Sequence, residues 1–248
     1  SRYFEPDIMI DNKAAITTRV APSFLRIGQI ELFARRVRNN AHDEALNELK
    51  MIVQHLIYRN YKDEIENEIS LESGLIKLAC LYRSRLISLV ANWMRVGYCQ
   101  GNFNSDNCAA GGYTLDYGPF GFCELFDPRF QPWTGGGEHF SFFNQPSAAE
   151  INFKTFCSSL SPLLSESKHD SEKLEQIVKD FSKLMNQELM KMWANKLGLE
   201  HYNETLINDF FNLMVISKAD YTILFRKLSE IPDNLDSLKD SFYLPINA

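Results

Sequence analysis

Apolar residues recur every three to four positions over most of this 248-residue chain, a spacing typical of amphipathic helices. Pro22 suits the first turn of the first such stretch, and Gly97 suits the position just after the third. Asp43 and Glu44 favour the N-terminus of the second stretch. The stretches are 24–38, 42–61, 73–96, 148–164, 172–197 and 204–229. The pattern therefore predicts a mainly α-helical protein.

Residues 98–146 break this pattern, because Gly, Asn, Pro and aromatic residues dominate there. Two short runs have the composition of strands: 15–20, which is rich in β-branched residues, and 113–115, which follows a Gly–Gly turn. Long irregular segments in compact domains usually carry function. We therefore expect a mainly α fold with a short β hairpin, and we expect the chemistry to lie within 98–146.

Net charge and the length of apolar runs indicate whether nucleic acids or membranes are expected partners. The 26 Lys and Arg residues against 32 Asp and Glu give a net charge of −6, and no basic run dominates. This balance disfavours a broad nucleic-acid-binding face, so no nucleic-acid partner is expected. The most apolar stretch, 75–94, is interrupted by polar residues and falls short of the roughly 18–20 apolar residues that a bilayer span needs. No membrane partner is expected either.

The cysteine pattern concerns the redox compartment. The chain has five cysteines, an odd number, and none of them forms a CxxC pair. This usage favours a reducing compartment and disfavours a disulfide framework or a thiolate zinc site.

Asp106, Asn107 and Asp116 form the most informative constellation. Magnesium prefers hard oxygen ligands, and protein kinases hold it with the Asp of an Asp-Phe-Gly motif and an Asn a little upstream. Here Asp116 begins Asp-Tyr-Gly, and Asn107 lies nine residues earlier. Asn107 and Asp116 are thus candidate metal ligands, and Asp106 can face a substrate hydroxyl. The alternative is turn chemistry, since Asp and Asn are common in turns.

The string Ser105-Asp106-Asn107 also matches one element of the serine β-lactamases. Those enzymes need an SxxK motif upstream and a KTG motif downstream. The SxxK of this chain, 165–168, lies downstream, and KTG is missing from the sequence. This alternative is therefore disfavoured.

Two arginines flank the sequence VAPSFL. Arg19 and Arg26 are candidates to converge on a polyphosphate, because guanidinium groups bind phosphate oxygens in pairs. The alternative for each is a solvated or ion-paired arginine, which needs no function.

Several long and unusual blocks together resemble the selenoprotein O family. The resemblance covers most of the chain, with its blocks in the family's order. The blocks are RVAPSFLRIGQIELFA (19–34), NSDN–DYGPFGF (104–122), FFNQP (142–146), INFKTFCSSLSPLL (151–164) and KLGL–ADYTILFRKLS (196–229).

This resemblance implies a protein-kinase-like fold and protein adenylylation. AMP would move from ATP to a Ser, Thr or Tyr hydroxyl of a target protein, and uridylylation with manganese is also attributed to some members. Asp106 matches the family's proton acceptor, Asn107 and Asp116 its Mg²⁺ (or Mn²⁺) ligands, and Arg19 and Arg26 its nucleotide contacts. Asp116 also lies against the nucleotide phosphates in the family. The implied location is the cytoplasm for a bacterial protein and the mitochondrion for a eukaryotic one.

The chain departs from the family pattern in places. Gln100 stands where the family carries a His, and the segment WTGGGEHFSFF is less acidic than its counterpart. The family's glycine-rich loop and nucleotide-binding Lys precede the matched region, so we expect a partial domain, mostly the C-terminal helical lobe. Its parts are the end of the N-lobe or a strand segment (1–21), helices (22–97), metal and nucleotide loops (98–146) and a helical region (147–248).

Two rivals remain open at this stage. One is a catalytically inactive pseudokinase that binds ATP without transfer, and the other is a helical interaction module. The intact set of Asp106, Asn107 and Asp116 favours the enzyme.

Overall fold

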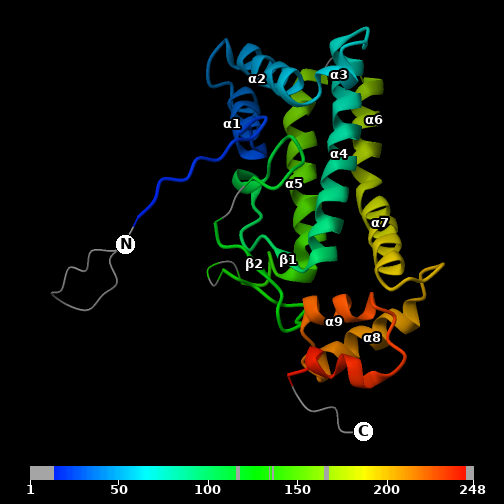
Figure 1. The fold of residues 1–248 in the computed structure, drawn as a ribbon. Helices are drawn as coiled ribbons and strands as arrows, with labels where there is room; N and C mark the ends of the chain where they lie inside the picture. Colours follow the sequence, from blue (N-terminus) through cyan, green and yellow to red (C-terminus); the bar gives the residue numbers. More distant parts are fainter. Residues whose placement is uncertain (1–13, 116–117, 134, 136, 165–167, 244–248) are drawn as a thin grey trace, which may run out of the picture.

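The computed structural model describes residues 14–115, 118–133, 135, 137–164 and 168–243. Within these ranges the chain is mainly helical, with a single two-stranded antiparallel sheet (Figure 1). The strands are β1 (Tyr98–Cys99) and β2 (Gly121–Phe122), with Tyr98 opposite Phe122. The helices are α1 (Ile27–Arg38), α2 (Ala45–Asn60), α3 (Lys62–Ile65), α4 (Leu71–Val96), α5 (Gln145–Leu160), α6 (Lys168–Lys179), α7 (Phe181–Lys196), α8 (Glu204–Ile216) and α9 (Tyr221–Leu228).

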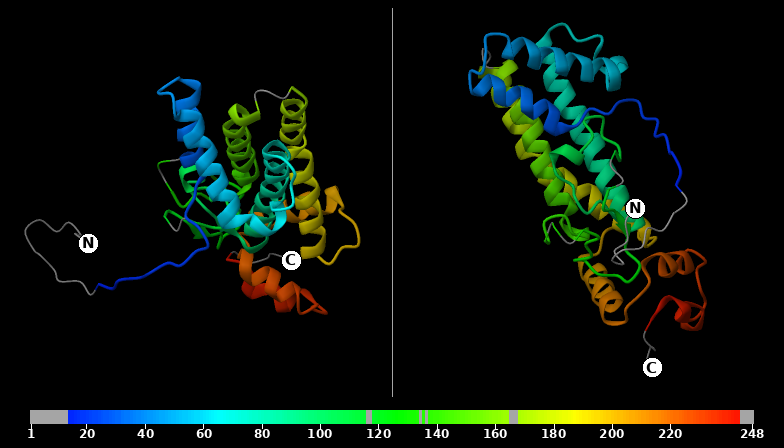
Figure 2. Two further views of the ribbon diagram at one scale, coloured as in Figure 1. Left: turned by 90° about the horizontal axis from the view of Figure 1, so that it is seen from above. Right: turned by 90° about the vertical axis from the view of Figure 1, so that its left-hand side faces the viewer.

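The helices form a bundle around α4. Helices α5, α6 and α7 run alongside α4, while α1 and α2 lie near one end and α8 and α9 near the other (Figures 1 and 2). The irregular segment between α4 and α5 lies on one side of the bundle, against α1. The prediction that the non-helical residues gather between two helical regions is confirmed.

Helix α4 shows why the predicted boundaries hold where local signals are strong. Ser70 Oγ accepts a hydrogen bond from Ser73 N at 3.2 Å, which caps the N-terminus. Gly97 follows the helix at φ +75°, a left-handed conformation that glycine adopts without a side-chain clash. The predicted helix 73–96 and its glycine stop are confirmed to within two residues.

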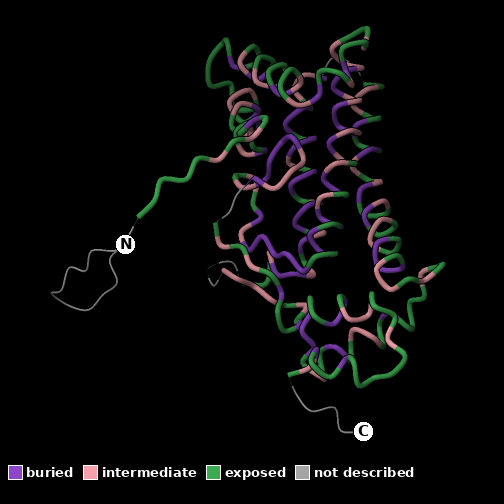
Figure 3. Tube along the Cα trace, in the orientation of Figure 1, coloured by how far each residue is buried: buried purple, intermediate pink, exposed green. Residues whose placement is uncertain are grey.

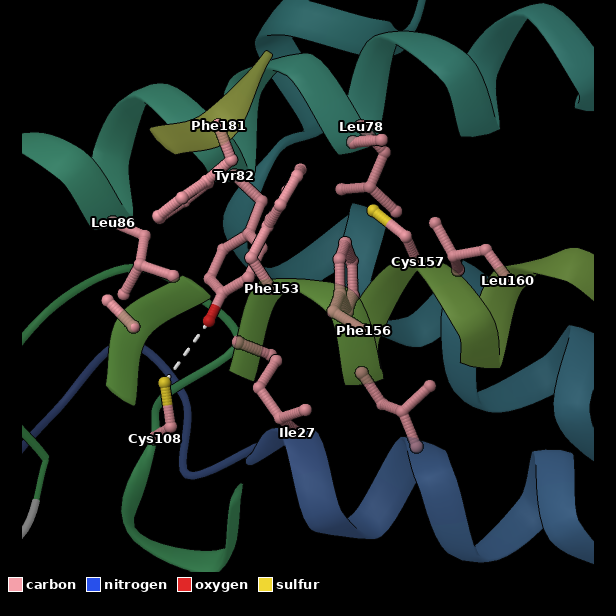
Figure 4. Close-up of a cluster of buried hydrophobic side chains, with 14 of the residues drawn as sticks. Ile27, Leu78, Tyr82, Leu86, Cys108, Phe153, Phe156, Cys157, Leu160 and Phe181 are labelled. Carbon is pink, nitrogen blue, oxygen red and sulfur yellow. Dashed lines mark hydrogen bonds between the residues drawn. The ribbon is translucent and has the colours of Figure 1, made fainter. Parts of the chain in front are cut away.

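The core of the bundle is aromatic. The Tyr82 and Phe156 ring centroids are 4.5 Å apart, and those of Phe153 and Phe181 are 4.9 Å apart (Figure 4). These residues lie on the inward faces of α4, α5 and α7, which Figure 3 shows as buried. Tyr82 OH also lies 3.2 Å from Cys108 Sγ. Cys108 is 1% exposed and belongs to this core, so the core extends to the irregular segment. Burial raises the pKa of its thiol to about 12.

A second cluster joins the bundle to α8 and α9. Tyr221 OH donates to Met94 O at 2.6 Å, near the end of α4. Lys196 Nζ donates to Arg95 O at 2.7 Å and lies 3.8 Å from the centroid of the Phe225 ring. These contacts hold α9 against the C-terminal ends of α4 and α7.

Both strand predictions are wrong. Residues 14–20 form no strand with any described residue, and the chain before Arg19 leads away from the helical bundle (Figure 2). Residues 113–115 are also not a strand: Tyr113 OH donates to Ser23 O, and Trp93 Nε1 donates to Thr114 Oγ1 at 2.8 Å. β-branched composition favours a strand only where a partner edge is present, and the sheet forms instead between β1 and β2.

Several helix boundaries also differ from the prediction. The first helix begins at Ile27, five residues after Pro22, because Arg26 pairs with Ala109 in an isolated antiparallel bridge. The predicted helix 172–197 is two helices, α6 and α7, separated at Asp180. The predicted helix 204–229 is also two, because Lys218 adopts φ +52° and Asp220 caps a new helix by accepting from Ile223 N at 2.8 Å.

Among the helices that the structure describes, none combines the length and the apolarity that crossing a bilayer requires.

Candidate functional site

The residues Asp106 and Asn107 lie in a short 3₁₀ turn, Ser105–Asn107, that Asn104 builds. Asn104 Oδ1 accepts hydrogen bonds from Asp106 N at 3.0 Å and Asn107 N at 3.2 Å. Asn107 Nδ2 in turn donates to Asn102 O at 2.8 Å. Because its amide nitrogen donates to the backbone, Asn107 keeps its Oδ1 as the side-chain oxygen that could bind a hard cation.

Two backbone hydrogen bonds attach this turn to the start of α1. Ile27 N donates to Cys108 O at 3.0 Å, and Ala110 N donates to Leu25 O at 2.9 Å. Between them lies the bridge of Arg26 with Ala109. Arg26 therefore lies opposite Ala109, and Asp106 is three residues before Ala109 in the sequence. Both Arg26 and Asp106 are exposed.

The first turn of α1 lies directly against the Asp106 carboxylate. A Cβ placed on Gly28 would be 2.0 Å from Asp106 Oδ1 and 3.3 Å from Ser105 Oγ. The absence of a side chain at Gly28 therefore makes room for the carboxylate. A helix N-terminus carries partial positive charge and favours an anion there. Sequence reasoning missed Gly28, although a glycine at the start of an amphipathic helix was a signal that could have been used.

The other arginine, Arg19, is held on the segment that leads to Asp116. Arg19 Nη2 donates to Thr114 O at 2.7 Å, and Thr114 is itself held by Trp93 of α4. Asp116 lies outside the described residues, two positions beyond Thr114 in the sequence. The structure thus brings together Asp106, Asn107 and the backbone of Arg26, and it positions Arg19 next to the sequence neighbours of Asp116.

A network of polar side chains, not predicted from the sequence, contacts the chain at Ala110. Tyr61 OH, fully buried, donates to Ala110 O at 2.8 Å. The Arg85 guanidinium stacks 4.1 Å from the Tyr61 ring centroid, donates to Asn60 O at 2.9 Å and pairs with Glu64. Burial raises the pKa of Tyr61, so its hydroxyl stays protonated and remains a donor. The network holds Ala110 and Gly111 against α4 and the end of α2.

Replacing Tyr61 by Phe is expected to lower the free energy of unfolding by about 1–3 kcal/mol, because the buried Ala110 carbonyl loses its partner. Denaturant unfolding of the complete protein measures this. The matched control is Tyr58→Phe: Tyr58 is 64% exposed in α2, three residues before Tyr61, and its loss of a hydroxyl should change the free energy by less than about 0.5 kcal/mol. Equal effects of the two substitutions would show that the Tyr61 hydrogen bond does not stabilise the segment.

The donor set for a cation is small in the part of the chain that the structure describes. No group of three or more His, Cys, Asp and Glu side chains gathers there. The expected ligand pair is of another kind, one amide oxygen from Asn107 and the carboxylate of Asp116. The fixed orientation of the Asn107 amide fits such a role.

Comparison with known proteins identifies relatives over nearly the whole chain. The family model described as "Protein adenylyltransferase SelO" matches residues 2–243. A protein nucleotidyltransferase YdiU of Aromatoleum aromaticum is 33% identical over 92% of this chain and 43% of its own length. Protein adenylyltransferase SelO-1, mitochondrial, of Danio rerio is 32% identical over 88% of this chain and 32% of its own length. This chain therefore spans less than half the length of these relatives, and it belongs to the SelO family of protein adenylyltransferases.

Proposed function

We propose that the complete protein transfers AMP from ATP to Ser, Thr or Tyr hydroxyls of target proteins in the presence of Mg²⁺ or Mn²⁺. The names of the family and of its relatives support nucleotidyl transfer in general. The observation that carries the proposal for this chain is the bridge between residues 25–27 and 108–110, because it gathers Arg26, Asp106 and Asn107 around one turn.

Asp106 is the group we assign as proton acceptor. Its exposed carboxylate can receive the proton of an incoming hydroxyl, a contribution of about 10²–10⁴-fold to the rate in typical enzymes. The hydroxyl oxygen forms a bond to the α-phosphorus of ATP, the bond from that phosphorus to the β-phosphate bridging oxygen breaks, and pyrophosphate leaves. Asp106 holds the proton at one carboxylate oxygen at the end of the step.

The remaining groups bind the nucleotide. Arg19 and Arg26 are assigned to the phosphates, where guanidinium forks neutralise charge and fix geometry. Asn107 and Asp116 are assigned as ligands of the divalent cation, which, when bound, neutralises phosphate charge. Anchoring of the Asn107 amide on Asn102 supports this assignment, because a pre-oriented ligand needs little reorganisation.

We also propose that the helical bundle is most of the C-terminal lobe of a kinase-like domain, with residues 98–146 as its metal and nucleotide loops. The glycine-rich loop and the nucleotide-binding Lys would lie in the part of the family that precedes the matched region. A mitochondrial location for a eukaryotic protein, and a cytoplasmic one for a bacterial protein, belongs to the same proposal.

The test is label transfer from ATP carrying radioactive phosphorus at the α or the γ position, with the complete protein and Mg²⁺ or Mn²⁺. We expect protein-bound label from α-labelled ATP and none from γ-labelled ATP. Transfer of γ-label would indicate kinase chemistry instead, and ATP binding without any transfer would indicate a pseudokinase. A parallel arm with α-labelled UTP measures the preference between adenylyl and uridylyl groups.

A further inference from the structure

A pocket of about 420 Å³ opens beside the Ser105–Asn107 turn, on the side of α5. Ser105 of the turn and Phe103, two residues before it, form part of its wall, and Phe140 contributes from the loop before α5. Ile151 and Thr155, one helical turn apart on α5, line it further. Ser105 immediately precedes Asp106, so the pocket begins one residue from the proposed proton acceptor.

A buried hydrogen bond connects the α5 wall of the pocket to the segment that leads into the turn. Asn152, only 2% exposed, donates from Nδ2 to Phe103 O at 2.9 Å. This hydrogen bond ties α5 to the chain two residues before the Ser105–Asn107 turn. A side chain seated in the pocket would therefore lie at a fixed position relative to Asp106.

The lining indicates what the pocket can accept. It contains two phenylalanines and an aliphatic residue, Ile151, that is 64% exposed, and its other members are small or uncharged polar residues apart from His139. Among the described residues, no Lys, Arg, Asp or Glu lines it. A triphosphate would lack Lys or Arg partners there, whereas an uncharged apolar side chain would bury surface against Phe140 and Ile151.

We propose that this pocket selects the acceptor: it binds an apolar side chain of the target polypeptide that lies close in sequence to the modified hydroxyl. The inference rests on the proposed nucleotidyl transfer and extends it to a substrate class, Ser, Thr or Tyr residues flanked by an aliphatic or aromatic residue. The nucleotide phosphates are assigned to Arg26, which pairs with Ala109 and is not a lining residue of the pocket. When the flanking side chain binds in the pocket, the hydroxyl is positioned next to Asp106. Binding energy is thus used to orient the nucleophile for transfer.

The test uses the complete protein, ATP and a peptide mixture in which one Ser, Thr or Tyr is surrounded by randomised positions. Mass spectrometry of the labelled peptides gives the preference at each position. For the wild type we expect Leu, Ile, Met and Phe to exceed Asp and Glu by about 10-fold at one flanking position, a discrimination within reach of an apolar pocket. For Ile151→Glu we expect the preference at that same position to move to Lys and Arg.

Controls separate this role from stability and from nucleotide binding. Leu213→Glu introduces the same charge at a residue of α8 that is 57% exposed and outside the pocket, and its preference profile should equal that of the wild type. Ser147→Glu repeats the charge change at a second exposed lining position, should Ile151→Glu lose stability. The KM for ATP should be unchanged in both pocket variants.

Three outcomes would overturn the inference. The first is an unchanged preference profile in the pocket variants that still label peptides. The second is a raised KM for ATP with unchanged peptide preference, because it would assign the pocket to the nucleotide base. The third is self-labelling of the wild type without labelling of any peptide. If the wild type transfers no label at all, to itself or to peptides, the proposed function itself fails.

Discussion

Replacing Asp106 by Ala is expected to lower the rate of AMP transfer by the complete protein about 10²–10⁴-fold, because the hydroxyl nucleophile loses its proton acceptor. The side chain is exposed, so little packing is lost. Its carboxylate lies at the N-terminus of α1, a contact worth about 0.3–1 kcal/mol, and the free energy of unfolding should fall by no more than that. Transfer of α-label and denaturant unfolding of the same preparations measure the two effects.

Two further variants sharpen this result. Asp106→Asn keeps the shape of the side chain and removes its basicity, so it should lose activity as Ala does. Asp209→Ala removes an exposed carboxylate from α8 and should leave the rate unchanged. If Asp106→Ala kept half or more of the wild-type rate, Asp106 would not be the proton acceptor.

Replacing Gly28 by Ala is expected to lower the transfer rate by about 10–100-fold while leaving stability equal or higher. The new Cβ would lie 2.0 Å from Asp106 Oδ1 and 3.0 Å from Cγ, so the carboxylate must move. A misplacement of about 1 Å at a reacting group can cost on the order of 10²-fold in rate. Ala is also a better helix former than Gly by about 1 kcal/mol, so loss of activity would not follow from unfolding.

The matched control for this substitution is Gly74→Ala, in the first turn of α4. There the nearest atom to an added Cβ is Ile65 Cγ2 at 3.4 Å, an ordinary contact. Activity should stay at the wild-type level and stability should not fall. Wild-type activity in Gly28→Ala would show that the position of the Asp106 carboxylate against α1 has no role in transfer.

The sequence predicted the parts of the fold whose signals are local. Apolar spacing and Gly97 sufficed for α4, and the contrast in composition located the irregular segment. Helix breaks at Asp180 and Lys218 were missed because apolar periodicity continues across them. The strand predicted at 15–20 was wrong because composition cannot supply a partner edge.

The site was predictable as a list of residues but not as a geometry. Motif spacing and resemblance named Arg19, Arg26, Asp106 and Asn107, yet the bridge that joins Arg26 to Ala109 pairs segments more than eighty residues apart in the sequence. Such pairing depends on tertiary packing, here the Tyr61 network behind residue 110. Local sequence patterns do not predict this pairing. The contact of Gly28 with Asp106 depends on it, so the role of Gly28 could not be predicted either.

The central claim is that Asn107, in the Ser105–Asn107 turn, and Asp116 together hold a divalent cation at the ATP phosphates. Electron paramagnetic resonance of Mn²⁺, titrated into the complete protein with a non-hydrolysable ATP analogue, tests it directly. We expect Mn²⁺ affinity to fall about 10-fold or more in both Asn107→Ala and Asp116→Ala, since even outer-shell changes typically cost 10–100-fold, and to stay unchanged in the exposed-amide control Asn47→Ala. Wild-type Mn²⁺ affinity in both ligand variants would contradict the account.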